Sequence, residues 1–141
     1  MGLAHDFDYL LKVDDDTGVY VDRIVHEALS GMWDYAGYPN GRVASGGPGY
    51  WLSKEAFKTV AETASSNYHW AEDVTVSNCL FHHNIQLVSL PGHKCGRADH
   101  WYFKDGFDPK HDMSDVSTFH AIQPEVMRAW YANLTELRKV K

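Results

Sequence analysis

A short apolar run that ends in three consecutive carboxylates restricts the fold of this chain more than any other feature. Residues 9–13 are Tyr, Leu, Leu, Lys and Val, and Asp14, Asp15 and Asp16 follow directly. Buried strands appear in sequence as brief apolar runs, so we expect a strand that ends where the acids begin. Three adjacent carboxylates repel one another, and a cation or a functional partner relieves that repulsion. Because α/β folds bind ligands at the carboxyl ends of strands, this junction is the candidate functional site.

The acidic junction is compatible with several kinds of site. Oxygen-rich clusters suit Mg²⁺ or Mn²⁺, although an acidic triplet is also common in a solvated turn. An EF-hand counted from Asp14 would need Gly at its sixth position and Glu at its twelfth, where this chain has Val19 and Val25. Residues 16–18 spell the Asp-Thr-Gly of aspartic proteases, but the residues on either side of them do not fit that class. The calcium loop is therefore excluded, and the protease is disfavoured.

The composition limits the class of protein. With 141 residues the chain corresponds to a single domain, residues 1–141. Its net charge of −6 argues against a partner bound through a nucleic-acid backbone. No apolar run approaches the roughly 20 residues of a membrane span. Five Trp and eight Tyr residues suit either a carbohydrate site or a core, and Cys79 and Cys95 leave disulfide formation open.

Periodicity and turn residues predict an alternation of helices and strands after the acids. The expected helices are 20–29, 53–64, one that starts at Glu72, and one that starts at Pro124. In the first of them we expect the apolar stripe to face the core and Gly31 to end the helix; that stripe is Val21, Ile24, Val25, Ala28 and Leu29. The expected strands are Tyr50–Leu52 and Ile85–Leu90. Loops are expected at 35–42, with a tight turn at Asn40-Gly41, and at 93–115.

Two further segments are candidates for function on weaker grounds. The glycines of Ser45-Gly46-Gly47-Pro48-Gly49 would let backbone approach a ligand closely, yet their spacing fits neither a P-loop nor a dinucleotide fingerprint. Glu72 and Asp73 open a helix, where acids commonly complement the helix dipole without any catalytic role. Neither segment defines a function by itself.

Four segments in order carry a resemblance to a known family: FDYLLKVDDDTGVYV, GGPGYWLSKEAF, EDVTVSNCL and TFHAIQPE. Together they extend from Phe7 to Glu125, and they resemble the β-1,3-galactosyltransferase and fringe-type glycosyltransferases, including the core-1 synthase group. The resemblance implies an α/β fold of the GT-A type, with a mixed sheet flanked by helices. It also implies an inverting transfer of a hexose from a UDP-sugar to a glycan or glycoprotein acceptor, with Mn²⁺ or Mg²⁺ as the cofactor.

The resemblance assigns roles to particular residues. Asp16, Asp14 and His120 correspond to the metal site, and Asp14 or Asp15 would face the ribose or the sugar. Asp73 corresponds to the catalytic base, with Glu72 as the less favoured choice. The donor-sugar pocket would be lined by Gly46, Gly47, Gly49, Tyr50 and Trp51.

This sequence departs from the family at its N-terminus, because six residues precede the first expected strand. Family members carry a nucleotide-binding half there, so we expect the metal-to-acceptor half of the fold. A partner chain or a homo-oligomer would then cover the exposed sheet edge. The family usually resides in the Golgi lumen, and this chain shows no membrane anchor, so its compartment stays open. Two alternatives remain: a non-catalytic carbohydrate-binding or oligomerising remnant of such an enzyme, and a metal-dependent hydrolase that uses Asp14, Asp16, Asp73 and His120.

Overall fold

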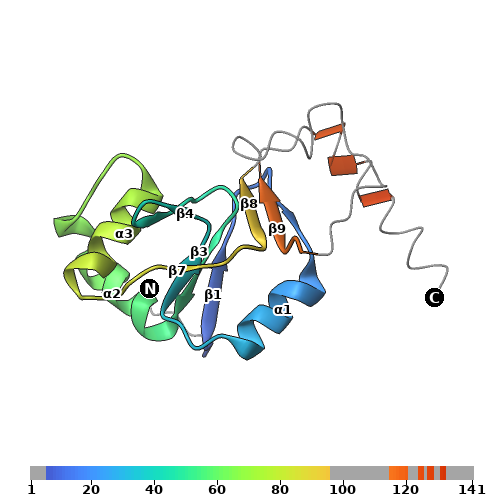
Figure 1. Ribbon diagram of the computed structural model, residues 1–141. Coiled ribbons are helices and arrows are strands. Elements are labelled where there is room, and N and C mark those ends of the chain that lie inside the picture. The colour runs from blue at the N-terminus through green and yellow to red at the C-terminus, as the bar shows by residue number, and fades with distance from the viewer. Residues whose placement is uncertain (1–5, 96–114, 121–123, 126, 129–130, 133–141) are drawn as a thin grey trace.

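The computed structural model describes residues 6–95, 115–120, 124–125, 127–128 and 131–132, and these form a mixed α/β structure (Figure 1). The helices are α1 (Val21–Ser30), α2 (Lys54–Thr63) and α3 (Glu72–His82), with a 3₁₀ turn η1 (Ala64–Ser66). The strands are β1 (Tyr9–Lys12), β2 (Gly18–Val19), β3 (Tyr35–Gly37), β4 (Pro39–Asn40), β5 (Val43–Ala44), β6 (Tyr50–Ser53), β7 (Val88–Ser89), β8 (His93–Cys95) and β9 (Thr118–His120). The expected fold class is confirmed at this level.

The larger sheet has four strands in the order β1-β6-β3-β7. Strand β6 pairs antiparallel with both β1 and β3, whereas β3 pairs parallel with β7. Side chains alternate along a strand, so Tyr50 and Leu52 of β6 point to one face and Trp51 points to the other. Helices α2 and α3 pack on the Tyr50 face, and α1 contacts the Trp51 face through Glu27. The sheet therefore has helices on both sides.

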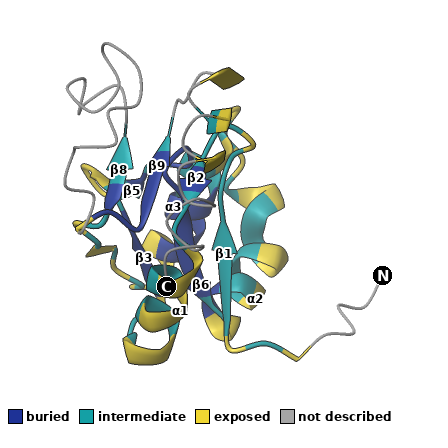
Figure 2. Cartoon of the chain, turned by 90° about the vertical axis from the view of Figure 1, so that its right-hand side faces the viewer, coloured by how far each residue is buried: buried dark blue, intermediate teal, exposed yellow. Residues whose placement is uncertain are grey.

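The core lies between this sheet and helices α2 and α3 (Figure 2). Its buried members are Tyr35, Ala44, Tyr50, Leu52, Ala56, Val76 and Leu80. The rings of Tyr35 and Tyr50 meet edge-on at 6.0 Å. Since these side chains come from β3, β5, β6, α2 and α3, one core joins three strands to two helices.

A second sheet, in the order β2-β9-β8, joins segments that are far apart in the sequence. Strand β9 pairs antiparallel with β2, where Gly18 opposes Phe119, and parallel with β8. The Phe119 ring lies against the backbone of Gly18. A Cβ at that position would come within 2.3 Å of a ring carbon, so only glycine fits there. This pairing brings the end of β9 beside the acidic turn.

Several local predictions are confirmed. Strand β1 ends at Lys12, two residues before the first acid, and β6 begins at Tyr50 as expected. Ser53 caps α2 by accepting a hydrogen bond from the amide of Ala56 at 3.1 Å. Helix α3 begins at Glu72. In each case the local signal and the tertiary packing favour the same structure.

The predicted loop at 35–42 is wrong in its first half. Tyr35–Gly37 is the buried strand β3, held between β6 and β7. The expected turn is present, since Gly41 adopts a φ of +64° between β4 and β5. Strand pairing on both edges of β3 overrode a composition that is typical of a loop.

Two other boundaries also differ from the sequence-based expectation. The strand expected over 85–90 is limited to Val88–Ser89, and the loop expected from residue 93 begins instead with strand β8. Pairing with β9 makes 93–95 a strand, and the sequence contains no local signal for that pairing. The rest of that loop, 96–114, and most of the helix expected from Pro124 lie outside the described residues.

The expectation that the apolar stripe of α1 faces the core is wrong. Val21, Val25 and Leu29 are 57%, 50% and 82% exposed, although the helix itself forms where predicted. The inward side of α1 carries Glu27, whose carboxylate accepts hydrogen bonds from three groups of the neighbouring elements. Satisfying that half-buried carboxylate orients α1 and leaves Val21, Val25 and Leu29 facing solvent.

The structure also bears on disulfide formation and on membrane spans. Cys79 and Cys95 are both free thiols. None of the described helices is long and apolar enough to cross a membrane.

Candidate functional site

Asp14, Asp16 and His120 come together at the junction of the two sheets. Nε2 of His120 lies 3.0 Å from Oδ1 of Asp16 and 3.7 Å from Oδ2 of Asp14. One donor atom from each residue lies within 4.8 Å of the others. Two carboxylate oxygens and one imidazole nitrogen form a donor set that suits Mn²⁺ or Mg²⁺.

The two sheets place these residues by separate means. Asp14 and Asp16 lie in a turn after β1, closed by a 3.2 Å hydrogen bond from the amide of Thr17 to the carbonyl of Asp14. His120 is the last residue of β9, and the pairing of Gly18 with Phe119 sets it beside Thr17. The β2–β9 pairing therefore joins the carboxylates to a histidine about 100 residues away.

Two buried polar atoms in this cluster lack hydrogen-bond partners within the described part of the chain: Oδ1 of Asp16 and Nδ1 of His120. The close approach of Asp16 to His120 is an ion-pair contact that is not aligned as a hydrogen bond. Oδ1 of Asp16 faces Nε2 of His120 without a hydrogen bond, whereas Nδ1 of His120 lies on the other side of the ring, against Gly47. The unbonded Oδ1 fits a cation shared with Nε2, because buried polar groups are otherwise bonded. The residues present thus fit a divalent ion.

Lys12 stands between this cluster and the acids of α3. Its Nζ atom donates to Oδ1 of Asp14 at 2.5 Å and lies 3.2 Å from Oε2 of Glu72. It also donates to the carbonyl of Gly46 at 3.3 Å. Burial alone would lower the pKa of Lys12, but the hydrogen bonds and charges of Asp14 and Glu72 raise it above its ordinary value. The ammonium group therefore offsets the repulsion among the carboxylates.

The two acids that open α3 have different environments. Glu72 accepts a hydrogen bond from the hydroxyl of Tyr50 and pairs with Lys12. Burial raises the pKa of Glu72, and the charge of Lys12 offsets part of that rise. Asp73 instead accepts from backbone amides, that of Gly46 at 3.1 Å and that of Val74 at 2.8 Å. Glu72 is thus held by side chains, while Asp73 anchors the glycine-rich segment.

The glycine-rich turn, residues 46–49, lies between Asp73 and His120. A Cβ on Gly47 would fall 2.2 Å from Nδ1 of His120, so the imidazole packs directly on this backbone. Gly49 has a φ of +91°, and a Cβ there would meet the carbonyl oxygen of Lys12 at 2.6 Å. Any residue larger than glycine would displace the His120 ring at position 47, and the end of β1 at position 49.

Two residues predicted for the substrate pocket do not join this arrangement. Trp51 points to the opposite face of the sheet, where it stacks near Tyr9 and Trp33 and donates to Glu27. The strict alternation of β6 decides this, because its neighbour Tyr50 faces Glu72. Asp15 is exposed in the acidic turn and does not belong to the three-residue cluster.

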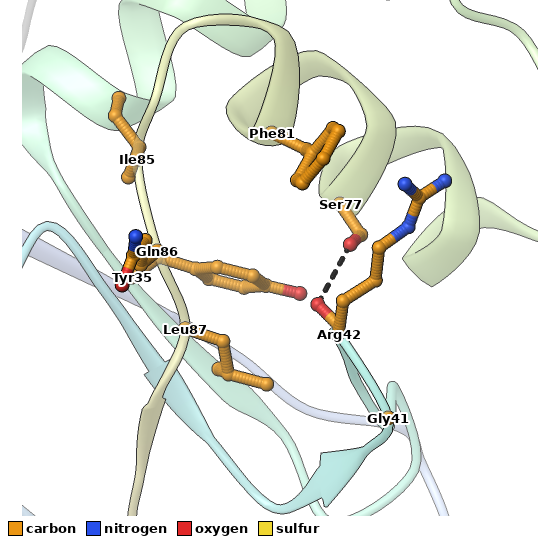
Figure 3. A pocket seen from close by; sticks show the side chains of 8 residues that line it. All are labelled: Tyr35, Gly41, Arg42, Ser77, Phe81, Ile85, Gln86 and Leu87. Carbon is orange, nitrogen blue, oxygen red and sulfur yellow. Dashed lines mark hydrogen bonds between the residues drawn. The ribbon is translucent and has the colours of Figure 1, made fainter.

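A separate pocket of about 260 Å³ lies toward the other end of α3 (Figure 3). Phe81 and Arg42 stand at its mouth, and the arginine lies 4.5 Å from the phenylalanine ring centre. Phe81 is nine residues beyond Glu72, about 14 Å along the helix axis. Inside, burial raises the pKa of Tyr35 to about 12, and its hydroxyl accepts from the amide of Ala44. This pocket is distinct from the acidic cluster.

Sequence reasoning did not single out Lys12, Thr17 or Thr118 as parts of the site. Lys12 carried a usable signal, since it is a cation within an apolar run directly before three acids. Thr17 donates to the carbonyl of Gly47 at 2.7 Å and Thr118 to that of Pro48 at 2.5 Å. The two threonines carried no such signal, because strand pairing decides what they contact.

The fold and the site together define an α/β protein with a candidate divalent-cation centre beside an acidic helix N-terminus. No protein-family model matches the chain.

Proposed function

We propose that this chain is a GT-A-like glycosyltransferase domain of the inverting β-1,3 type. It would transfer a hexose from a UDP-sugar to a hydroxyl of a glycan or glycoprotein acceptor, with Mn²⁺ or Mg²⁺ as its cofactor. The observation that carries the proposal is the convergence of Asp14, Asp16 and His120 beside the acids of α3. The order of the sequence segments that resemble the family supports it independently.

In this proposal the acidic cluster serves the leaving-group side of the reaction. A divalent ion, when bound, stabilises the charge that develops on a departing diphosphate. Asp14, Asp16 and His120 would hold that ion, and the ion would share Asp14 with Lys12, which donates to it at 2.5 Å. A binding experiment with the metal tests this assignment directly.

The acids of α3 serve the acceptor side. An inverting transfer needs one carboxylate to take the proton of the attacking hydroxyl. Asp73 is assigned this role, because backbone amides fix its carboxylate and leave lone pairs free for the hydroxyl. Glu72 is assigned to holding Lys12, since both of its oxygens are engaged by side chains. A two-metal hydrolase has less support, because Asp73 bonds Gly46 rather than joining the three ligands.

The test of the proposal is thermal unfolding with Mn²⁺, with UDP, and with both together. Stabilisation by UDP should require the metal, and it should vanish in chelator. A UDP effect that persists in chelator contradicts metal bridging, and the absence of any Mn²⁺ effect contradicts a divalent-cation site. Binding of both without sugar transfer identifies a non-catalytic remnant.

The assignment of Asp73 as the catalytic base is tested by comparing variants of Asp73 and Glu72. Asp73→Asn should abolish transfer while donor binding is kept, and Glu72→Gln should weaken transfer less. Glu62→Gln, an exposed change on α2, is the matched control. Full turnover in Asp73→Asn would move the role to Glu72.

A further inference from the structure

The glycine-rich turn is fixed by an unusual set of hydrogen bonds. Each of its four consecutive carbonyl oxygens accepts a bond from a side chain of another segment. The donors are Lys12 Nζ to Gly46 (3.3 Å), Thr17 Oγ1 to Gly47 (2.7 Å), Thr118 Oγ1 to Pro48 (2.5 Å) and His93 Nδ1 to Gly49 (3.0 Å). Because these donors lie on both sheets, the turn cannot move without breaking contacts to each of them.

His93 differs from the other three donors because both of its ring nitrogens face acceptors. Its side chain is fully buried, with Nδ1 3.0 Å from the carbonyl of Gly49 and Nε2 3.0 Å from Oε2 of Glu27. A carbonyl oxygen can only accept, so Nδ1 must carry a proton.

The protonation of Nε2 follows from the other partners of Glu27. Its Oε2 also accepts from Nε1 of Trp51 at 3.1 Å, and its Oε1 accepts from the hydroxyl of Ser117 at 2.5 Å. An indole N–H and a serine hydroxyl both donate to Glu27, which favours the ionised carboxylate, and the pKa of Glu27 lies below its ordinary value. An ionised carboxylate can only accept, so a hydrogen bond between the two side chains requires a proton on Nε2 of His93 as well.

We propose that Glu27 and His93 are positioning residues for the candidate site, and that their buried ion pair fixes the glycine-rich turn against His120. Neither residue touches Asp14, Asp16 or His120 in the contacts described above. The pair acts at two points: His93 holds Gly49, and Glu27 holds Ser117, three residues before His120 in the chain. Helix α1 is thereby tied to both sides of the cluster.

The electrostatic surroundings agree with this assignment. Burial alone would raise the pKa of Glu27, but the hydrogen bonds from His93 and Ser117 outweigh it and lower the pKa below its ordinary value. Lys94, next to His93 on β8, pairs with Asp115 at 3.4 Å. Glu27 is thus the charged partner that contacts the ring. Only the relevance of the turn to metal binding rests on the proposed glycosyltransferase function.

The first experiment needs no substitution. Ring ¹⁵N–¹H correlations of the wild-type chain at pH 6 to 8 report the protons on both nitrogens of His93. We expect two ring protons that exchange slowly with solvent, because the ring is buried. A neutral ring with one proton would overturn the proposal, and it would do so whether or not the protein binds a metal.

The second experiment measures what the pair holds in place. In His93→Gln and Glu27→Gln, amide hydrogen exchange at Gly47, Gly49 and His120 should accelerate about tenfold. His83→Gln is the matched control, since His83 also contacts a backbone carbonyl, that of Cys79, but lies exposed at the end of α3. Unchanged exchange in both pair variants would overturn the positioning role.

A third measurement separates this proposal from the proposed function. Line broadening by Mn²⁺ at Asp16 and His120 should weaken in the pair variants and stay unchanged in His83→Gln. If Mn²⁺ broadens no signal in the wild type, the metal-dependent function fails, while ring protons and amide exchange still decide the role of Glu27 and His93. If a variant does not fold, the wild-type ring spectrum decides.

Discussion

The Nζ atom of Lys12 lies 2.5 Å from Oδ1 of Asp14, which is one of the three candidate metal ligands. Lys12 faces Tyr50 across the β1–β6 pairing, so the sheet directs it toward the acids of α3 as well. The side chain is 28% exposed, which limits screening by solvent. The ammonium group of Lys12 therefore contacts Asp14, which is also a proposed ligand of the divalent ion.

Replacement of Lys12 by Met should therefore affect metal binding and stability in opposite directions. Without metal, the loss of the ammonium leaves Asp14 and Glu72 unneutralised, and the free energy of unfolding should fall by about 1 kcal/mol. The affinity for Mn²⁺ should rise, because Lys12 no longer competes for Asp14. Titration calorimetry and thermal unfolding would measure both effects. Lys58→Met, an exposed change on α2, controls for loss of charge, and a weaker affinity in Lys12→Met contradicts the competition.

Replacement of Asp16 by Asn should remove the response to metal. At Mn²⁺ concentrations about 100-fold above the dissociation constant, the wild-type melting temperature should rise by roughly 5–10 °C. Asp16→Asn should show little of that rise, because it removes the negative charge of the carboxylate closest to His120. Asp22→Asn, in the exposed first turn of α1, should keep the full response. An equal response in both variants would exclude Asp16 as a ligand.

Replacement of Gly47 by Ala should disturb His120 specifically. The added Cβ would lie 2.2 Å from Nδ1 of the imidazole, so the ring or the turn must shift. We expect the Mn²⁺-induced rise in melting temperature to be largely lost. Gly41→Ala is a useful comparison, since it strains a positive φ by about 1 kcal/mol but meets no atom within 4 Å. Its response to metal should be normal, and a normal response in Gly47→Ala would contradict the packing argument.

The Glu27–His93 pair predicts how stability depends on pH at the acidic end. The folded-state pKa of Glu27 lies below its ordinary value of 4.5, so its carboxylate stabilises the fold above that pH. This stabilisation is lost as the pH falls through the folded-state value. At pH 7, Glu27→Gln should cost about 3 kcal/mol, because it removes the ionised acceptor of three hydrogen bonds, one of them to the fully buried His93 ring. The difference between wild type and variant, followed by denaturant unfolding, should shrink toward pH 3, and a constant difference would argue against an ionised Glu27.

The elements whose local signals agree with their packing were predictable from sequence. An apolar run that stops at acids predicted β1, and Ser53 predicted the start of α2, because a cap and a strand end are properties of a few neighbouring residues. The same holds for the turn at Gly41. Strand β3 was mistaken for a loop, since its stability comes from β6 and β7 rather than from its own composition.

Some residues of the candidate site were likewise predictable from the sequence, and the placement of others depends on the fold. The sequence pointed to Asp14 and Asp16 as a cluster, and a resemblance in ordered segments added His120. The position of Lys12 between Asp14 and Glu72 depends on which face of β1 it occupies. Trp51 was expected in the donor pocket, but the alternation of β6 turns it toward α1. Sequence neighbours can thus serve opposite faces of one sheet.

By itself the sequence determined the residues of the acidic turn, the ends of the helices and the mixed α/β class, because these depend on contacts within a few residues. Only the tertiary structure decided that His120 meets Asp16, that Glu27 rather than an apolar stripe faces the sheet, and that His93 holds Gly49. The physical reason is that buried polar and charged groups require partners, and in this chain those partners come from elements far apart in the sequence, such as His93, which lies 66 residues from Glu27.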